Sequence, residues 1–333
     1  MESIIILTVL VVFFALAFDF INGFHDTANA IATAVSTRAL PPRVAVLMAA
    51  TMNFIGAITF TGVAQALAKD IVDPFALENG VVIILAALIS AIIWNLATWY
   101  FGIPSSSSHA LIGSLAGAAA MAAGFSAINW EGFTKIIKAL ILSPFIAIVI
   151  GFLMMTLFKV IFSGFSLYKT NNGFRKVQIF TAAVQSFTHG TNDAQKSMGI
   201  ITMALMAGGL LGQGSEIPLW VRISCALAMG LGTSVGGYKI IKTVGSKIMK
   251  IRPVNGVAAD MSSALIIFGA TQLHLPVSTT HVISSAIMGV GAAQNAKGVK
   301  WGVARNIVIT WVITLPLAGL MGGGIFLLLN LFL

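Results

Sequence analysis

The chain has 333 residues, of which 58% are hydrophobic and only 9% are charged, too few charges to cover the surface of a soluble globular protein. Its net charge of +9 does not indicate nucleic-acid binding, because the basic residues lie in short loops between apolar segments. The single cysteine, Cys225, excludes an intramolecular disulfide bond and any metal or redox site built on a CxxC pair.

The first apolar segment is expected to stay in the protein as a membrane span. It has no basic leader (Glu2 is acidic) and no small-residue cleavage pattern follows it, unlike a signal peptide. Nine further segments of membrane-spanning character follow. The ten expected segments are 4–36, 43–66, 80–101, 105–125, 139–158, 177–208, 218–238, 256–273, 277–293 and 304–331. The first and sixth are too long for one straight crossing and polar in the middle, so we expect both to be broken helices.

The distribution of Lys and Arg predicts that both termini and the 70–78 loop face the outside of the cell. In this orientation fourteen basic residues lie in inside loops and three in outside loops, with Arg222 at a span edge. Loops on the cytoplasmic side are enriched in Lys and Arg. The fourteen are Arg38, Arg43, Lys159, Lys169, Arg175, Lys176, Lys239, Lys242, Lys247, Lys250, Arg252, Lys297, Lys300 and Arg305, and the three are Lys69, Lys135 and Lys138.

Two motifs occur twice, in the same order and at similar spacing. FINGFHDTANA at 20–30 aligns without gaps with FTHGTNDAQKS at 187–197, and PSSSSHALIGSLAG at 104–117 aligns with PVSTTHVISSAIMG at 276–289. Such self-similarity indicates an internal duplication, with residues 1–165 as the first repeat and 166–333 as the second.

Each half holds five segments, and an odd number makes the second half enter the membrane from the opposite face. The predicted fold is therefore an all-α polytopic membrane protein of two inverted five-segment repeats, without a soluble domain. Broken helices or re-entrant hairpins would bring the number of transmembrane helices to about 10–12, as in secondary transporters.

Four carboxylates lie within or at the edge of apolar segments, where an ionisable group costs roughly 3 kcal/mol or more and suggests a functional site. They are Asp19, Asp26, Asp193 and Asp260. The duplication preserves Asp26 and Asp193, each with a glycine three residues before it, and we expect Gly23 and Gly190 to let the helices unwind and free backbone carbonyls. For Asp19 and Asp260, a functional role and a purely structural hydrogen-bonded role are equally open.

Carboxylate, amide and carbonyl oxygens suit a small hard cation such as sodium, and a proton could load the same Asp instead. The residues predicted to bind the cation are Asn22, Asp26, Asn29, Asn192 and Asp193. His25 and His189 are interpreted as packing or helix-linking groups, since no cluster of zinc-binding spacing is visible.

The two Pro-Ser/Thr runs predict an anion site. Proline ends one segment and Ser or Thr caps the next helix, leaving free N–H groups and hydroxyl donors at a helix N-terminus with partial positive charge. Plain N-capping is the alternative, and the repetition of the run favours the anion site. The predicted anion-binding residues are Ser105, Ser106, Ser107, Ser108, Ser278, Thr279 and Thr280, with Lys196 as a positive charge.

GFHDTANA at 23–30, GTNDAQKS at 190–197 and the paired P-x-S-[ST]-[ST]-H runs resemble the inorganic phosphate transporter (PiT) family of sodium- or proton-coupled permeases. The likeness covers essentially the whole chain. It implies import of inorganic phosphate by symport with a cation, sodium or a proton, across the cytoplasmic membrane of a bacterium or archaeon, with the anion site holding phosphate. The chain departs from the family pattern at His25, where the motif has Asn, and at Lys196, which stands where the first copy has Asn29.

The expected partners are inorganic phosphate, sodium ions and membrane lipid, with no cofactor beyond the coupling ion; a homo-oligomer is left open. A sulfate or other oxyanion permease is the nearest alternative. A channel would require downhill flux that no cation gradient drives. A membrane hydrolase would need a nucleophile–base pair or metal cluster that the sequence does not present, so no enzymatic activity is expected.

Overall fold

The computed structural model describes residues 2–72, 79–212 and 214–332, and these are helical apart from short connections and one antiparallel bridge between Val72 and Ile128. Residues 73–78 of the loop predicted to face outward lie outside the described residues. The α-helices are α1 (Glu2–His25), α2 (Thr27–Ser36), α3 (Pro42–Thr59), α4 (Gly62–Asp70), α5 (Gly80–Phe101), α6 (Ser107–Ala123), α7 (Trp130–Ile161), α8 (Leu167–Ala207), α9 (Leu219–Val235), α10 (Tyr238–Lys242), α11 (Pro253–Gln272), α12 (Thr279–Asn295) and α13 (Trp301–Leu329). A π-helical turn, η2 (Thr243–Lys247), continues α10, and the 3-10 turns η1 (Phe125–Ala127) and η3 (Ala296–Gly298) follow α6 and α12.

The number of candidate spans is smaller than the ten to twelve predicted. Among the described helices, six spans are long and apolar enough to cross a membrane, one of them formed by α1 and α2 together, and α9 with the bent α10–η2 segment would make seven. The helices α6 and α12 have only 17 residues each, short of a full crossing. The 41-residue helix α8 is long enough to cross a membrane, but its polar residues make it less apolar than the six candidate spans.

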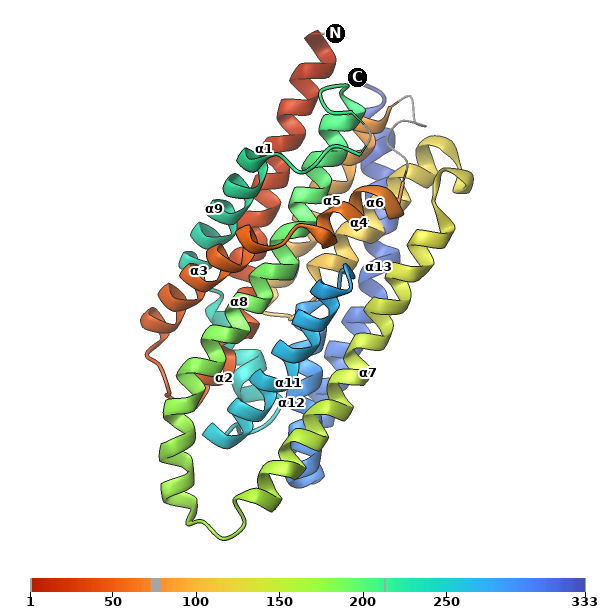
Figure 1. Ribbon diagram of the computed structural model, residues 1–333. Helices are drawn as coiled ribbons and strands as arrows, with labels where there is room; N and C mark the ends of the chain where they lie inside the picture. Colours follow the sequence, from red (N-terminus) through yellow and green to blue (C-terminus); the bar gives the residue numbers. More distant parts are fainter. Residues whose placement is uncertain (1, 73–78, 213, 333) are drawn as a thin grey trace.

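Both termini lie at one end of the molecule and the α7–α8 connection lies at the other (Figure 1). The helices α5 and α6 form one hairpin, and α11 and α12 form a second. The first hairpin opens toward the termini, where Asn79 Nδ2 donates to Asn330 Oδ1 at 3.4 Å. The second opens toward the opposite end, where Lys159 Nζ near the end of α7 donates to the Ala293 carbonyl at 3.0 Å. The hairpins therefore enter from opposite ends, and their tips meet inside.

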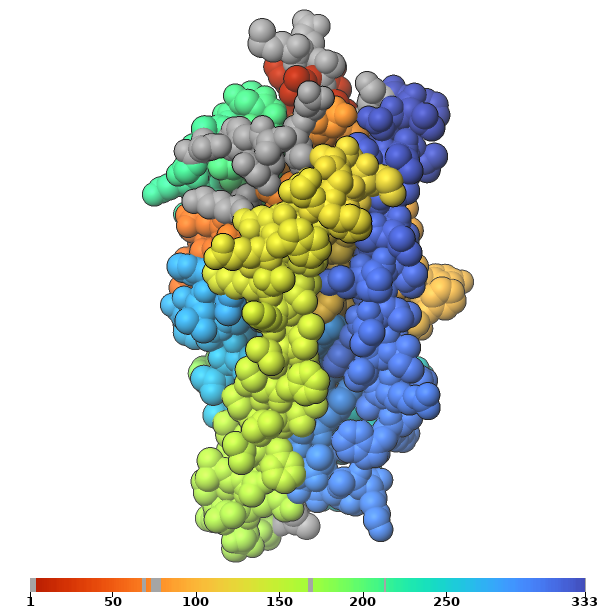
Figure 2. Space-filling view, turned by 90° about the vertical axis from the view of Figure 1, so that its right-hand side faces the viewer, coloured from red at the N-terminus to blue at the C-terminus, as the bar shows by residue number. Residues whose placement is uncertain are grey.

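Large apolar side chains cover the outside of the bundle. Figure 2 shows α7 running along one face beside α13, and both helices expose residues such as Phe145, Leu153 and Leu320. Such helices are stable only where lipid surrounds them, because their backbone polar groups are satisfied internally and their side chains are apolar.

Both repeated glycines serve close helix packing, and at Gly190 this corrects the prediction that they unwind helices. A Cβ on Gly23 of α1 would lie 2.4 Å from the Met229 carbonyl oxygen of α9, and one on Gly190 of α8 would lie 2.3 Å from that of Asn53 in α3. Only glycine lets these backbones approach so closely. The helix α8 is accordingly continuous through Gly190, so the sixth expected segment is not broken. The first is interrupted between His25 and Thr27, at Asp26.

Gly117 provides a test of this packing in the first hairpin. A Cβ there would lie 2.0 Å from the Gly319 carbonyl oxygen of α13, whereas one on Gly324 would meet nothing within 4 Å. We expect Gly117→Ala to lower the midpoint of thermal unfolding in detergent, because overpacking costs about 1–3 kcal/mol and exceeds the helix propensity of about 0.5–1 kcal/mol gained with Ala. Gly324→Ala is the matched control and should unfold at or above the wild-type midpoint. Equal midpoints for both variants would contradict the packing role.

Candidate functional site

Asp26 occupies the interruption between α1 and α2 and is 2% exposed. Its carboxylate accepts a short hydrogen bond from Ser107 Oγ at the start of α6 and another from Thr280 Oγ1 in α12 at 3.0 Å. His25 Nδ1 lies 2.6 Å from Asp26 Oδ1. One carboxylate therefore holds the tips of both hairpins at once.

Asp193 lies within the continuous helix α8 and is fully buried. Lys196 Nζ, one helical turn further on, forms a short ion pair with Asp193 Oδ1 and donates to the Val277 carbonyl at 3.0 Å. Thr279 Oγ1 donates to Asp193 Oδ2 at 2.9 Å, and His189 Nε2 lies 3.2 Å from the same oxygen. The second repeated carboxylate thus binds the second hairpin and carries its own cation.

The two Ser/Thr runs come together as expected. Ser108 Oγ of the first run donates to the Val277 carbonyl of the second at 3.1 Å. Ser106 and Ser278 cap the helices α6 and α12 by accepting hydrogen bonds from the backbone N–H groups of His109 and His281. The runs therefore divide by role: Ser106 and Ser278 are caps, whereas Ser107, Thr279 and Thr280 face the carboxylates.

Ser105 is held away from the carboxylates, since its Oγ donates to Thr98 Oγ1 of α5 at 2.8 Å. The same Thr98 oxygen lies 3.0 Å from His25 Nε2. Ser105 thus belongs to a hydrogen-bond chain that leads through Thr98 and His25 to Asp26.

The three predicted asparagines differ in what they hold. Asn29 Nδ2 donates to Thr280 Oγ1 at 2.8 Å while its Oδ1, buried, has no hydrogen-bond partner. Asn22 Oδ1 lies 3.3 Å from Ser107 Oγ. Asn192 clamps the second hairpin instead: its Oδ1 accepts from Val277 N–H and its Nδ2 donates to the Leu275 carbonyl, each at 3.2 Å.

The two histidines next to the carboxylates were not predicted as part of the site. His25 and His189 do link helices, as interpreted, through Thr98 of α5 and Asn53 of α3, but each also touches its Asp. Their positions relative to the carboxylates differ, one residue before Asp26 and four before Asp193, so the duplication gave no signal for them. Among the described residues no group of His, Cys, Asp and Glu is arranged to hold a metal ion such as zinc.

The two carboxylates that the duplication does not repeat differ in position: Asp260 lies away from the hairpin tips, and Asp19 lies near Lys196. Asp260 of α11 accepts from Thr33 Oγ1 at 2.7 Å and Thr181 Oγ1 at 3.1 Å, a fully satisfied pair of hydrogen bonds away from both tips. Asp19 of α1 is fully buried and interacts electrostatically with Asp193 and Lys196. Both carboxylate oxygens of Asp19 are buried without a hydrogen-bond partner, on the side of the site where Lys196 lies.

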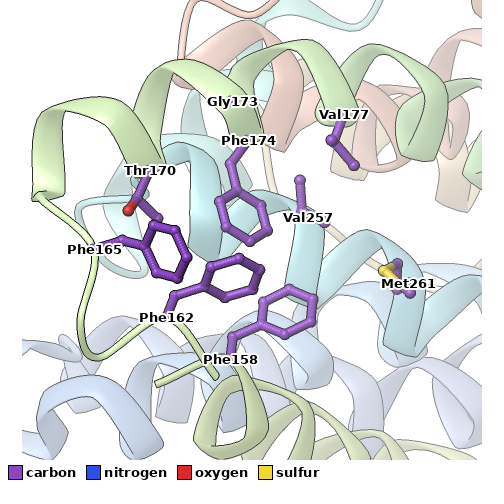
Figure 3. Close-up of a pocket in the computed structure, with 9 residues that line it drawn as sticks. All are labelled: Phe158, Phe162, Phe165, Thr170, Gly173, Phe174, Val177, Val257 and Met261. Atoms are coloured by element: carbon purple, nitrogen blue, oxygen red, sulfur yellow. The ribbon is translucent and has the colours of Figure 1, made fainter. Parts of the chain in front are cut away.

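Two apolar cavities do not coincide with this polar site. One, of about 440 Å³, lies at the α7–α8 connection and is lined by aromatic and apolar side chains, as Figure 3 shows for Phe158, Phe162 and Phe174. Another, of about 410 Å³, lies between α7 and α13 and reaches the rings of His109 and His281, whose centroids are 4.5 Å apart and whose planes are tilted by 35°. Neither contains a carboxylate or an ammonium group.

Comparison with known proteins gives consistent matches. The model of the phosphate transporter family matches residues 22–322. A protein of Bacillus subtilis described as a probable low-affinity inorganic phosphate transporter is 66% identical over 99% of both chains, and one of Rhizobium meliloti with the same description is 48% identical over 92% of both. A solved structure described as the sodium-dependent phosphate transporter is similar with a TM-score of 0.87 and 27% identity, covering 98% of this chain and 100% of that one.

The hydroxyls that bridge tips and carboxylates can be tested one at a time. We expect Ser107→Ala and Thr280→Val to raise the half-saturating phosphate concentration about ten- to a hundredfold, since a hydrogen bond to a charged group contributes about 1.5–3 kcal/mol. The measurement is labelled phosphate uptake into proteoliposomes containing equal amounts of inserted protein. Thr310→Val is the control, because that exposed hydroxyl only bonds the Asn306 carbonyl of its own helix. Unchanged phosphate affinity in both site variants would show that the anion sits elsewhere.

Proposed function

The chain belongs to the phosphate transporter family, and from that premise we propose that it imports inorganic phosphate by symport with a cation, which is sodium. The observation that carries the proposal is the position of Asp26, which accepts hydrogen bonds from Ser107 of one hairpin and Thr280 of the other. A carboxylate shared by two mobile elements can couple the loading of a cation to the arrangement of both.

Phosphate is held between the hairpin tips. The helices α6 and α12 begin there, at Ser107 and Thr279, and their N-termini offer backbone N–H groups and partial positive charge. The hydroxyls of Ser107, Thr279 and Thr280 already converge on this region, and Lys196 Nζ lies against the Val277 carbonyl beside it. Such a donor set needs no arginine to bind an anion.

The cation binds at the interruption between α1 and α2. Asp26 supplies a carboxylate, and the side-chain oxygens of Asn22 and Asn29 supply hard neutral ligands beside it. The unpartnered, buried Oδ1 of Asn29 supports this assignment, since a buried acceptor without a donor is otherwise costly.

Coupling follows from competition for the same hydroxyl groups. Without a cation, the hydroxyls of Ser107 and Thr280 donate hydrogen bonds to Asp26 and are not available to phosphate. A cation at Asp26 neutralises the carboxylate, so that these hydroxyls can turn toward the anion. Cation and phosphate therefore strengthen each other's binding, and the effect is reciprocal.

The two alternatives are a proton in place of sodium and sulfate in place of phosphate, and each depends on particular groups of the site. The contact of 2.6 Å between His25 Nδ1 and Asp26 Oδ1 would let a proton, rather than sodium, load the carboxylate. Sulfate is disfavoured as substrate, because phosphate at neutral pH keeps a proton that an ionised carboxylate can accept, and sulfate has none to donate. Competition between phosphate and sulfate in the uptake assay separates these substrates.

The proposal includes two inverted repeats, residues 1–165 and 166–333, in the cytoplasmic membrane with both termini outside. The two hairpins entering from opposite ends support it, as do the matched packing partners: α6 lies against α13, whereas α12 lies against α7. Alternating access in inverted-repeat transporters is a movement of the halves around a central site.

We expect Asp26→Asn to abolish or strongly weaken stimulation of phosphate uptake by a sodium gradient, since the variant keeps the shape of the side chain but loses its charge. Uptake into proteoliposomes with an imposed sodium gradient, and separately with a pH gradient, measures this and identifies the cation. Asp260→Asn is the matched control and should keep its cation dependence. Normal cation dependence in Asp26→Asn would refute the cation site.

The orientation is tested with single cysteines in a Cys225→Ser background. Asn172 and Ser126 are both exposed and lie at opposite ends of the molecule, at the start of α8 and in the turn between α6 and α7. An impermeant thiol reagent added to intact cells should label Ser126→Cys and leave Asn172→Cys unlabelled until the membrane is opened. The reverse pattern would overturn the proposed orientation.

A further inference from the structure

We propose that the ammonium group of Lys196 permanently fills the second cation position, so that the chain couples each phosphate to a single exchangeable cation, bound at Asp26. This inference rests on the proposed symport and specifies its stoichiometry. It narrows the cation site predicted from the sequence, which included Asn192 and Asp193, to the first repeat.

The duplication places Lys196 and Asn29 at equivalent positions, each three residues after the repeated carboxylate and on the same helical face. Asn29 offers a side-chain oxygen to a cation, and its Oδ1 is buried without a hydrogen-bond partner. Lys196 offers no oxygen and brings a positive charge of its own. The two halves therefore differ at the residue that decides whether a free ion is needed.

The contacts of Lys196 Nζ are those that a bound cation would make. The ammonium lies against a carboxylate oxygen of Asp193 and 3.0 Å from the Val277 carbonyl oxygen. Lys196 is fully buried, and it is the only buried Lys or Arg among the side chains whose burial the structure describes. An unpaired ammonium would be costly in such a position, so its pairing with Asp193 is maintained.

The other potential ligands of the second half are already engaged. Asn192 Oδ1 accepts from Val277 N–H, and Asp193 Oδ2 accepts from Thr279. The helix α8 is continuous here, so its carbonyls serve the helix, whereas the first repeat is interrupted at Asp26. The oxygens left without a hydrogen-bond partner here are those of Asp19 and Ser197, and a second sodium ion beside them would meet the fixed positive charge of Lys196.

The test counts the cations that accompany each phosphate. In proteoliposomes, the ratio of labelled sodium to labelled phosphate uptake, and the cation gradient at which net phosphate flux reverses, should give one cation per phosphate for the wild type. The reversal measurement counts protons equally well. Lys196→Asn restores the residue of the first repeat, and we expect its ratio and the Hill slope for the cation to rise from about one toward two. Lys196→Arg keeps the charge, and in a Lys196→Arg variant that transports phosphate the cation-to-phosphate ratio and the Hill slope should stay at about one.

A wild-type ratio of two cations per phosphate would overturn this inference and leave the symport itself standing. Phosphate uptake that no cation gradient drives would refute the proposed symport instead, so the two failures are distinguishable. A Lys196→Asn variant that transports with an unchanged slope would also overturn it, because Lys196 would then not be what fills the position. If that variant does not transport, equilibrium binding of labelled sodium to purified wild-type protein decides: one ion per chain supports the inference and two refute it.

Discussion

The arrangement depends on the need to satisfy Asp26 and Asp193 inside an apolar bundle. A buried carboxylate requires hydrogen-bond donors or a counter-ion, and both residues also draw donors from segments distant in sequence. Ser107 and Thr280 reach Asp26 across 81 and 254 residues, and Thr279 reaches Asp193 across 86. These bonds pull the tips of two hairpins, which enter from opposite ends, to one place. Close glycine contacts between the surrounding helices make that approach sterically feasible.

The same duplicated motif has been put to two different uses. In the first copy the helix is interrupted at Asp26 and Asn29 has a free side-chain oxygen, which suits a cation that comes and goes. In the second copy the helix continues through Asp193 and Lys196 supplies the charge itself. An ammonium tethered by its own helix cannot leave with the substrate. In the proposed symport, this difference between the two copies would set how many ions can be exchanged.

Composition and repetition were sufficient to predict an all-α membrane protein and to single out the two Ser/Thr runs and the two carboxylates, which hydrogen bonds join in the structure. Fewer helices qualify as candidate spans than the ten to twelve predicted, because apolar character does not distinguish a crossing helix from a short arm of a hairpin such as α6 or α12. The continuity of α8 was also missed, since Gly190 is compatible with either unwinding or close packing and only its neighbour Asn53 decides between them. The contacts of His25 and His189 depend on distant partners, and a single sequence carries no record of those.

In the proposed symport, alternating access would follow from the bonds that Asp26 accepts from both hairpins. In the proposed orientation, opening toward the outside breaks the bond from Ser107, whereas opening toward the inside breaks the bond from Thr280. Without phosphate to take over these hydroxyls, losing both bonds at once would leave the carboxylate with its cation and the contact from His25 alone, which is expensive in a low-dielectric interior. When one of the two hydroxyls leaves Asp26, the carboxylate therefore holds the other one more tightly. One shared carboxylate thereby disfavours a path open to both sides, which separates a coupled transporter from a channel.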